Sequence, residues 1–311
     1  AFIASLLHSS CHHYSILPIY LFLFSRMSYK SEFAENGFAL VENIFNDEEI
    51  AEMKEAIKQI VEDFDFDNLP KSVFATSDES KHAKDEYFVE SGAEVRGFFE
   101  EGALNKDGEV IVEKQFALNK VGHALHWLNP VFKKYSFHAK LKEIMRTLDF
   151  DAPQIVQSMY IFKQPRIGGL VNEHIDATFL RANPIGNLVG LWIALDDATE
   201  ENGCLHFVPG SHKTTTADYS FVRTYNKDGP IVEFRGPKPD YTGLPFVPVP
   251  VKKGSLVLIH GLCVHKSESN TSDKTRHAYT MHILESKGAQ WLKENWLQQT
   301  PTYSFPNMYD H

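Results

Sequence analysis

Polar and apolar positions in the first half of the chain predict helices. After Asn46, apolar residues recur at helical spacing: Ile50, Met53, Ile57, Ile60 and Val61. Asn46 is a good N-cap, and the three acidic residues that follow suit the positive end of a helix dipole. The pattern predicts a helix that begins after Asn46 and packs one apolar stripe against a core.

A second helical pattern runs from about Asn129 to Leu148. Leu141, Ile144, Met145 and Leu148 stand at helical spacing, with basic residues between them. We therefore expect one half-buried helix over this stretch.

After Asp151 the pattern changes to alternation and to β-prone apolar runs, separated by Gly, Pro, Asn and Asp. The predicted strands cover 155–162, 188–195, 204–208, 246–251, 255–259 and 278–284. Helices followed by many short strands are typical of an antiparallel barrel or jelly roll flanked by helices. The segment 213–245 is polar and rich in Gly and Pro, which predicts a long loop that is a lid, a binding loop or a mobile insert.

Composition and charge narrow the class of protein. The 311 residues are 43% hydrophobic and 23% charged, as in an ordinary globular protein, and we expect one domain. The formal net charge of −10 repels polyanions, which argues against nucleic acid as a partner. Three cysteines, an odd number, fit a reducing compartment, and a cytoplasmic location is the expectation.

Residues 1–26 differ from the rest of the chain. They contain no Asp or Glu, and their apolar run is interrupted by Pro18 and is shorter than the roughly 20 residues of a membrane span. We expect an upstream extension or leader that is not native, with a targeting segment as the alternative, and a single domain over 27–311. The segment also holds four residues of metal-ligand type without acidic partners, which are not expected to bind a metal: His8, Cys11, His12 and His13.

Three residues suggest a metal site. His174 and Asp176 are two apart at a predicted strand, so both side chains can point to the same side. His265 follows the apolar run 255–259 and adds a second imidazole. Two histidines and one carboxylate make a facial triad that holds Fe(II) and leaves positions for a 2-oxo acid and dioxygen. Arg276 has the planar fork that suits the far carboxylate of that acid.

Other arrangements compete with this triad. His260 ends the same apolar run and is a rival for the second imidazole. A tetrahedral zinc site from Cys204, His206, Cys263 and His265 would indicate a structural protein or a hydrolase. A third alternative is a jelly roll that binds 2-oxoglutarate but is catalytically silent.

Several motifs together resemble the phytanoyl-CoA dioxygenase family of Fe(II)- and 2-oxoglutarate-dependent oxygenases. These are His174-x-Asp176, His265-x-Ser267 through Arg276, and the segments 202–205 and 208–212. Further similar segments are 85–92, 119–126, 157–165 and 294–298. The resemblance extends from about Phe33 to the C-terminus.

The resemblance implies a mainly β fold, a cupin-like double-stranded β-helix (jelly roll) with flanking N-terminal helices. It implies iron on His174, Asp176 and His265, and a 2-oxoglutarate pocket lined by Lys120, Met159, Trp192, Ser267 and Arg276. Strand alternation is consistent with a place for Trp192 in this pocket, because Trp192 falls on the face opposite Val189, Leu191 and Ile193.

The family also implies an oxidoreductase. Dioxygen would be consumed, succinate and CO2 released, and a C–H bond of an unidentified small-molecule or acyl substrate hydroxylated or oxidatively demethylated. Because Asp176 would occupy the position that a halide needs, halogenation is not expected. The segment 213–245 offers no obvious basic cradle for the phosphates of an acyl-CoA, and no pattern indicates an oligomeric state.

Overall fold

The computed structural model describes residues 28–73, 85–224 and 229–311. The proposed upstream extension, and the His and Cys residues within it, lie outside the described residues.

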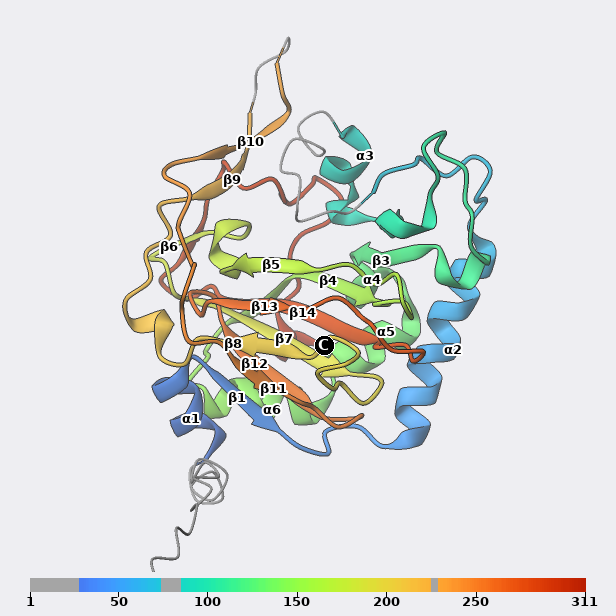
Figure 1. The fold of residues 1–311 in the computed structure, drawn as a ribbon. Coiled ribbons are helices and arrows are strands. Elements are labelled where there is room, and N and C mark those ends of the chain that lie inside the picture. The colour runs from blue at the N-terminus through green and yellow to red at the C-terminus, as the bar shows by residue number, and fades with distance from the viewer. Residues whose placement is uncertain (1–27, 74–84, 225–228) are drawn as a thin grey trace, which may run out of the picture.

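Antiparallel β-sheets form the centre of the fold, as expected for a jelly roll (Figure 1). The larger sheet has seven strands in the order β1-β12-β7-β14-β4-β3-β2, and a second sheet has four in the order β11-β8-β13-β5. The strands of the larger sheet are β1 (Phe38–Val41), β2 (Val95–Phe99), β3 (Leu118–His123), β4 (Pro153–Ile161), β7 (Leu188–Ala194), β12 (Leu256–His260) and β14 (Ala278–Glu285). Those of the smaller sheet are β5 (Val171–His174), β8 (Leu205–Phe207), β11 (Val247–Val249) and β13 (His265–Ser267).

The helices are short except for one. They are α1 (Tyr29–Asn36), α2 (Asp47–Asp63), α3 (Glu86–Val89), α4 (Leu125–Leu128), α5 (Pro130–Ser136) and α6 (Ala139–Thr147). Apolar residues of α2, α5 and α6 share one core cluster with Val189, Leu191 and Ile193 of β7. These helices therefore cover one face of the large sheet, and the other face of β7, which carries Trp192, is left for a cavity.

The predicted helix after Asn46 is confirmed as α2. The Asn46 side chain accepts a hydrogen bond from the Glu49 amide at 2.9 Å, and the Glu49 carboxylate accepts one from the Asn46 amide at 2.8 Å. This reciprocal pair is a capping box, and it satisfies two of the amides that the first turn leaves unpaired. Four residues of the predicted stripe are buried and Ile60 is half-buried.

The prediction of one helix from Asn129 to Leu148 is wrong, because the stretch forms two helices. Asn129 does cap the first of them, α5, and accepts a hydrogen bond from the Val131 amide at 3.0 Å. The backbone of His138 is extended (φ −63°, ψ 141°), which ends the helical path. The His138 ring then accepts a hydrogen bond from the Lys140 amide at 3.3 Å and caps α6.

All six predicted strands are present, with ends displaced by a few residues at most. The segment 213–245, expected to be a long loop, contains the hairpin of β9 (Ser220–Arg223) and β10 (Val232–Arg235). Phe221 and Phe234 are cross-strand partners in that hairpin, which lies at one end of the molecule, at the top of Figure 1. Two further short strands, β6 (Ala182–Asn183) and β15 (Gln290–Trp291), pair with each other.

The described part of the chain contains no helix with the length and apolar character needed to cross a membrane.

Candidate metal centre and its cavity

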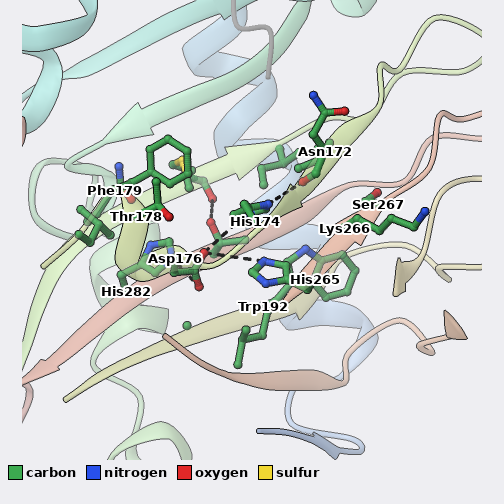
Figure 2. Close-up of a pocket in the computed structure, with 18 of the residues that line it drawn as sticks. Asn172, His174, Asp176, Thr178, Phe179, Trp192, His265, Lys266, Ser267 and His282 are labelled. Atoms are coloured by element: carbon green, nitrogen blue, oxygen red, sulfur yellow. Dashed lines mark hydrogen bonds and ion pairs between the residues drawn. The ribbon is translucent and has the colours of Figure 1, made fainter. Parts of the chain in front are cut away.

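Two strands of the smaller sheet bring the two candidate histidines together, and Asp176 lies beside them (Figure 2). His174 ends β5 and lies directly opposite His265 of β13, with their ring centroids 4.2 Å apart. One ligand atom each from His174, Asp176 and His265 lies within 4.8 Å of the other two. Over 28–73, 85–224 and 229–311, no other group of three or more His, Cys, Asp or Glu side chains converges in this way.

Asp176 reaches the site from a different element than the sequence predicted. The strand ends at His174 instead of starting there, and Asp176 opens a short 3₁₀ helix, Asp176–Thr178. Ile175 between them points into a separate apolar cluster with Val208 and Val264. The Asp176 Oδ1 atom lies 3.7 Å from the Nε2 atoms of both histidines.

Backbone carbonyls fix the orientation of both imidazoles. The Nδ1 atom of His174 lies 2.8 Å from the Asn172 carbonyl, and that of His265 lies 3.0 Å from the Cys263 carbonyl. A carbonyl oxygen only accepts, so each Nδ1 carries the proton and each Nε2 is left as a lone-pair donor for a metal. Burial lowers the pKa of His265 to about 4, which keeps this ring in the neutral form that a metal ligand needs.

His282 of β14 supports the carboxylate, and the sequence reasoning missed it. Its Nε2 atom lies 3.3 Å from Asp176 Oδ2. Burial alone would raise the pKa of Asp176, but the His282 and His265 imidazoles hold it well below the usual range of an aspartate. The alternation of the predicted strand 278–284 could have placed 280 and 282 on one face, but no local motif singles out His282.

Arg276 lies in the same cavity, two residues before β14. Its side chain is 2% exposed, and the guanidinium carbon sits 5.2 Å from the centre of the Trp192 ring. Nη2 donates to Ser267 Oγ at 3.3 Å, whereas Nε and Nη1 are buried without a hydrogen-bond partner in the described structure. Burial lowers the pKa of Arg276 to about 10, so the group remains a cation at neutral pH. A buried cation with unpaired N–H groups is costly unless an anion binds it.

The remaining residues that the resemblance implied also line this cavity. Lys120 of β3 donates to the Met159 sulfur at 4.0 Å, and burial lowers the lysine pKa to about 7. Ser267 and Trp192 complete the set, in a cavity of about 280 Å³.

Lys163 is a further cavity residue that the sequence reasoning missed. Its Nζ donates to the Gly169 carbonyl at 2.6 Å, and burial together with the nearby Arg276 lowers its pKa to about 6. Lys163 follows β4 in the sequence, and no pattern of neighbouring residues predicts that it lines the cavity.

The rival ligand His260 lies elsewhere. Its ring packs near His212 and Phe33, with centroids 4.9 and 5.8 Å away, and it does not line the cavity. The alternative with His260 in the triad is therefore wrong.

The alternative zinc site is not formed either. His265 pairs with Phe207 across the sheet and His206 pairs with Lys266, so the two histidines point to opposite faces. Burial raises the pKa of the Cys204 thiol to about 11 and that of Cys263 to about 12, which disfavours the thiolates that zinc binds.

Aromatic side chains form part of the wall of the cavity. Phe179 follows Asp176 and its ring centroid lies 6.0 Å from that of His174, and the hairpin contributes Phe221 and Phe234. Phe179 lies 5.9 Å from Phe221, and Phe88 and Trp296 continue the wall. The sequence analysis expected a binding role for 213–245 but did not identify these rings.

Comparisons with known proteins agree with this site. The family model described as "Phytanoyl-CoA dioxygenase (PhyH)" matches residues 33–278. The chain is 56% identical over 282 residues to "Phytanoyl-CoA dioxygenase domain-containing protein 1 homolog" of Caenorhabditis briggsae, covering 90% of this chain and 98% of that protein. It is 44% identical over 281 residues to "Phytanoyl-CoA dioxygenase domain-containing protein 1" of Mus musculus, covering 89% and 96%.

Among solved structures, similarity extends to proteins of low sequence identity. The epimerase SnoN, solved with Fe3+, alpha ketoglutarate and nogalamycin RO, matches with a TM-score of 0.60 at 16% identity, over 89% of this chain and 91% of that one. EctD from S. alaskensis, solved with 2-oxoglutarate and 5-hydroxyectoine, matches with a TM-score of 0.54 at 17% identity, over 89% and 79%. These likenesses establish the jelly-roll fold. The family match and the close relatives go further, and together they show that the chain belongs to the phytanoyl-CoA dioxygenase family.

Proposed function

We propose that this protein is an Fe(II)- and 2-oxoglutarate-dependent dioxygenase that hydroxylates, or oxidatively demethylates, a C–H bond of a small-molecule or acyl substrate, with release of succinate and CO2. One observation carries the proposal. Two imidazoles and a carboxylate converge in a cavity that also contains a buried guanidinium, whose Nε and Nη1 atoms have no hydrogen-bond partner among the described residues.

The donor set fits Fe(II). His174, Asp176 and His265 would hold the ion through two neutral nitrogens and one anionic oxygen, the composition of a facial triad. The Nδ1 atoms of both histidines are held by carbonyls, so both Nε2 atoms are available. Iron bound there would supply dioxygen activation coupled to oxidative decarboxylation of 2-oxoglutarate.

The protein's own part is to bind and orient the co-substrate. Arg276 would donate from its unpaired N–H groups to the distal carboxylate, and the Ser267 hydroxyl, which accepts from Nη2, lies beside it. Trp192 holds the guanidinium from one side, which limits the orientations of the fork. The aromatic wall excludes water from the reacting groups.

Anaerobic titration with Fe(II) and 2-oxoglutarate, followed by exposure to air and measurement of succinate, tests the proposal. His174→Ala and Asp176→Ala should abolish iron-dependent succinate formation. Wild-type turnover by His174→Ala would rule out the assignment. Bound zinc without succinate would favour a structural or hydrolytic protein, and tight 2-oxoglutarate binding without turnover would favour a silent binder.

We also propose that 27–311 form a single domain. β1, near one end of this range, pairs with β12, and Asn307, near the other end, forms a bridge with Gln154 of β4 in the same sheet.

We further propose a cytoplasmic location. The two free thiols in the described chain are buried, as is common in a reducing compartment.

A further inference from the structure

His123 is a buried histidine that the proposed reaction does not use. It ends β3, is 1% exposed and lines the same cavity as the triad. Its ring is surrounded by aromatic side chains, with centroids 5.1 Å from Trp296, 5.4 Å from Phe98 and 5.8 Å from Phe88.

A hydrogen-bond chain fixes the tautomer of His123. The Ser91 hydroxyl lies 2.5 Å from the Phe88 carbonyl and 2.7 Å from His123 Nδ1. Because the carbonyl only accepts, the hydroxyl proton belongs to that bond, and Nδ1 must be the donor to Ser91 Oγ. The lone pair of the neutral ring is therefore on Nε2.

In the described structure no hydrogen bond reaches that Nε2 atom. Burial, then the charges of Lys120, His282 and Arg96, hold the pKa of His123 well below the usual range of a histidine. The ring is thus a neutral acceptor without a donor, inside a cavity. A ligand in the cavity that donates a hydrogen bond to this Nε2 atom would satisfy the acceptor.

The aromatic wall connects His123 to the metal centre. Successive ring contacts run from His174 through Phe179, Phe221, Phe88 and Trp296 to His123, each with a centroid distance between 4.5 and 6.2 Å. On the sheet below, Gly190, His282 and Gln157 are register partners on adjacent strands, and all three line the cavity. A molecule that lies along this wall could reach both the iron position and His123.

The surroundings of His123 disfavour a charged group. An anion would face the Nε2 lone pair, and a cation would face the same positive charges that keep His123 neutral. Lys120 lines the same cavity and can balance an anion, but a carboxylate has no proton to donate to Nε2. The cavity of about 280 Å³ must also contain 2-oxoglutarate, so only a compact group can enter beside it.

We propose that the substrate of this enzyme presents a compact, uncharged apolar group with one O–H or N–H donor, and that Nε2 of His123 accepts its hydrogen bond. His123 is thereby a specificity-determining residue of the substrate subsite. The inference rests on the proposed function.

Binding of matched probes to the anaerobic protein loaded with Fe(II) and 2-oxoglutarate tests this, with calorimetry as the measurement. The probes are 2-naphthol, its methyl ether 2-methoxynaphthalene, and 2-naphthoate. Wild-type protein should bind 2-naphthol about tenfold more tightly than the ether, because only the naphthol donates, and should bind the naphthoate least.

Three variants separate the hydrogen bond from the packing. His123→Phe keeps a ring among the aromatic side chains and should reduce the preference for naphthol over its ether to about one. Ser91→Ala leaves the cavity lining unchanged but frees the tautomer, so the preference should fall partway. His260→Phe is the matched control outside the cavity and should retain the full preference.

Unchanged selectivity in His123→Phe would overturn the inference, as would wild-type protein that prefers the naphthoate or binds none of the probes. The absorption band of 2-oxoglutarate chelated to Fe(II) is recorded in the same samples. If the band forms and selectivity fails, only this inference is wrong. If the band does not form, the proposed function itself fails.

Discussion

At the scale of single residues, co-substrate binding depends on polar groups of the cavity that have no hydrogen-bond partner within the described protein. Arg276 has Nε and Nη1 buried without a partner in the described structure, and a Lys there would retain the charge but lose the fork. We predict that Arg276→Lys weakens 2-oxoglutarate binding by about 10- to 100-fold, the loss of one charge-assisted hydrogen bond. Arg166→Lys, in an exposed ion pair with Asp273, is the control. Equal affinity of Arg276→Lys and wild type in an anaerobic titration would contradict the assignment of Arg276.

His282 is predicted to tune the metal through Asp176. His282→Leu removes the group that lies 3.3 Å from Asp176 Oδ2 and should weaken Fe(II) binding by about 10- to 100-fold. His282→Gln can still donate a hydrogen bond and should recover part of that affinity. The measurement is an anaerobic competition with a chromogenic chelator. If both variants bind iron like wild type, His282 has no part in holding the carboxylate.

The sequence could predict the three residues of the triad because their signal is local or follows a recognisable run. His174 and Asp176 stand two apart, and the family resemblance favours His265 over His260, which ends the same apolar run. His282 and His123 carry no such signal, since their positions depend on the register between strands distant in sequence. His282 lies opposite Gln157 and Gly190, and only the assembled sheet brings it to Asp176.

At the scale of elements, the caps and strand ends determine where each helix or strand begins and ends. The capping box of α2 is exposed, so its contribution can be measured with little effect on the core. Asn46→Ala should lower the free energy of unfolding by about 1 kcal/mol. Glu48→Gln in the same turn should change it by less than about 0.5 kcal/mol. Urea unfolding of both variants gives the comparison, and equal stabilities would contradict the role of the cap.

Long apolar strands were predictable and short polar ones were not. β7, β12 and β14 are almost entirely buried, and their apolar runs are visible in the sequence. β5 and β13 are short and have few apolar residues, so no apolar run predicted where these two strands begin and end. The break between α5 and α6 was missed for a similar reason, because the cap is a histidine, which is not among the usual capping residues.

At the scale of the whole molecule, several neutral histidines are buried in different parts of the fold. Burial lowers the pKa of His126 to about 3, and that of His260 and His277 to about 4. The unfolded chain binds these protons near pH 6.5, whereas the folded protein does not bind them until about pH 4. Stability should therefore be greatest above pH 6.5 and should fall as the pH decreases toward 4.

Urea unfolding at pH 7.5, 6.0 and 5.0 measures this dependence. In His260→Phe one titrating group is gone, so the fall in the free energy of unfolding between pH 7.5 and 5.0 should be about 1–2 kcal/mol smaller than in wild type. Stability that does not change over this range, or a variant as pH-sensitive as wild type, would contradict the buried neutral state of His260.

The direct pairing of His174 with His265 has a mechanical consequence. β5 is the outermost strand of its sheet and pairs there with β13 alone, so one flank of its backbone has no ladder partner within that sheet. An ion held by both imidazoles would tie this edge strand to its neighbour. We predict that chelation of the metal increases amide hydrogen exchange over 171–174 and leaves 256–260, in the interior of the large sheet, unchanged. Equal exchange of 171–174 with and without metal would show that the edge is secured by its hydrogen bonds alone.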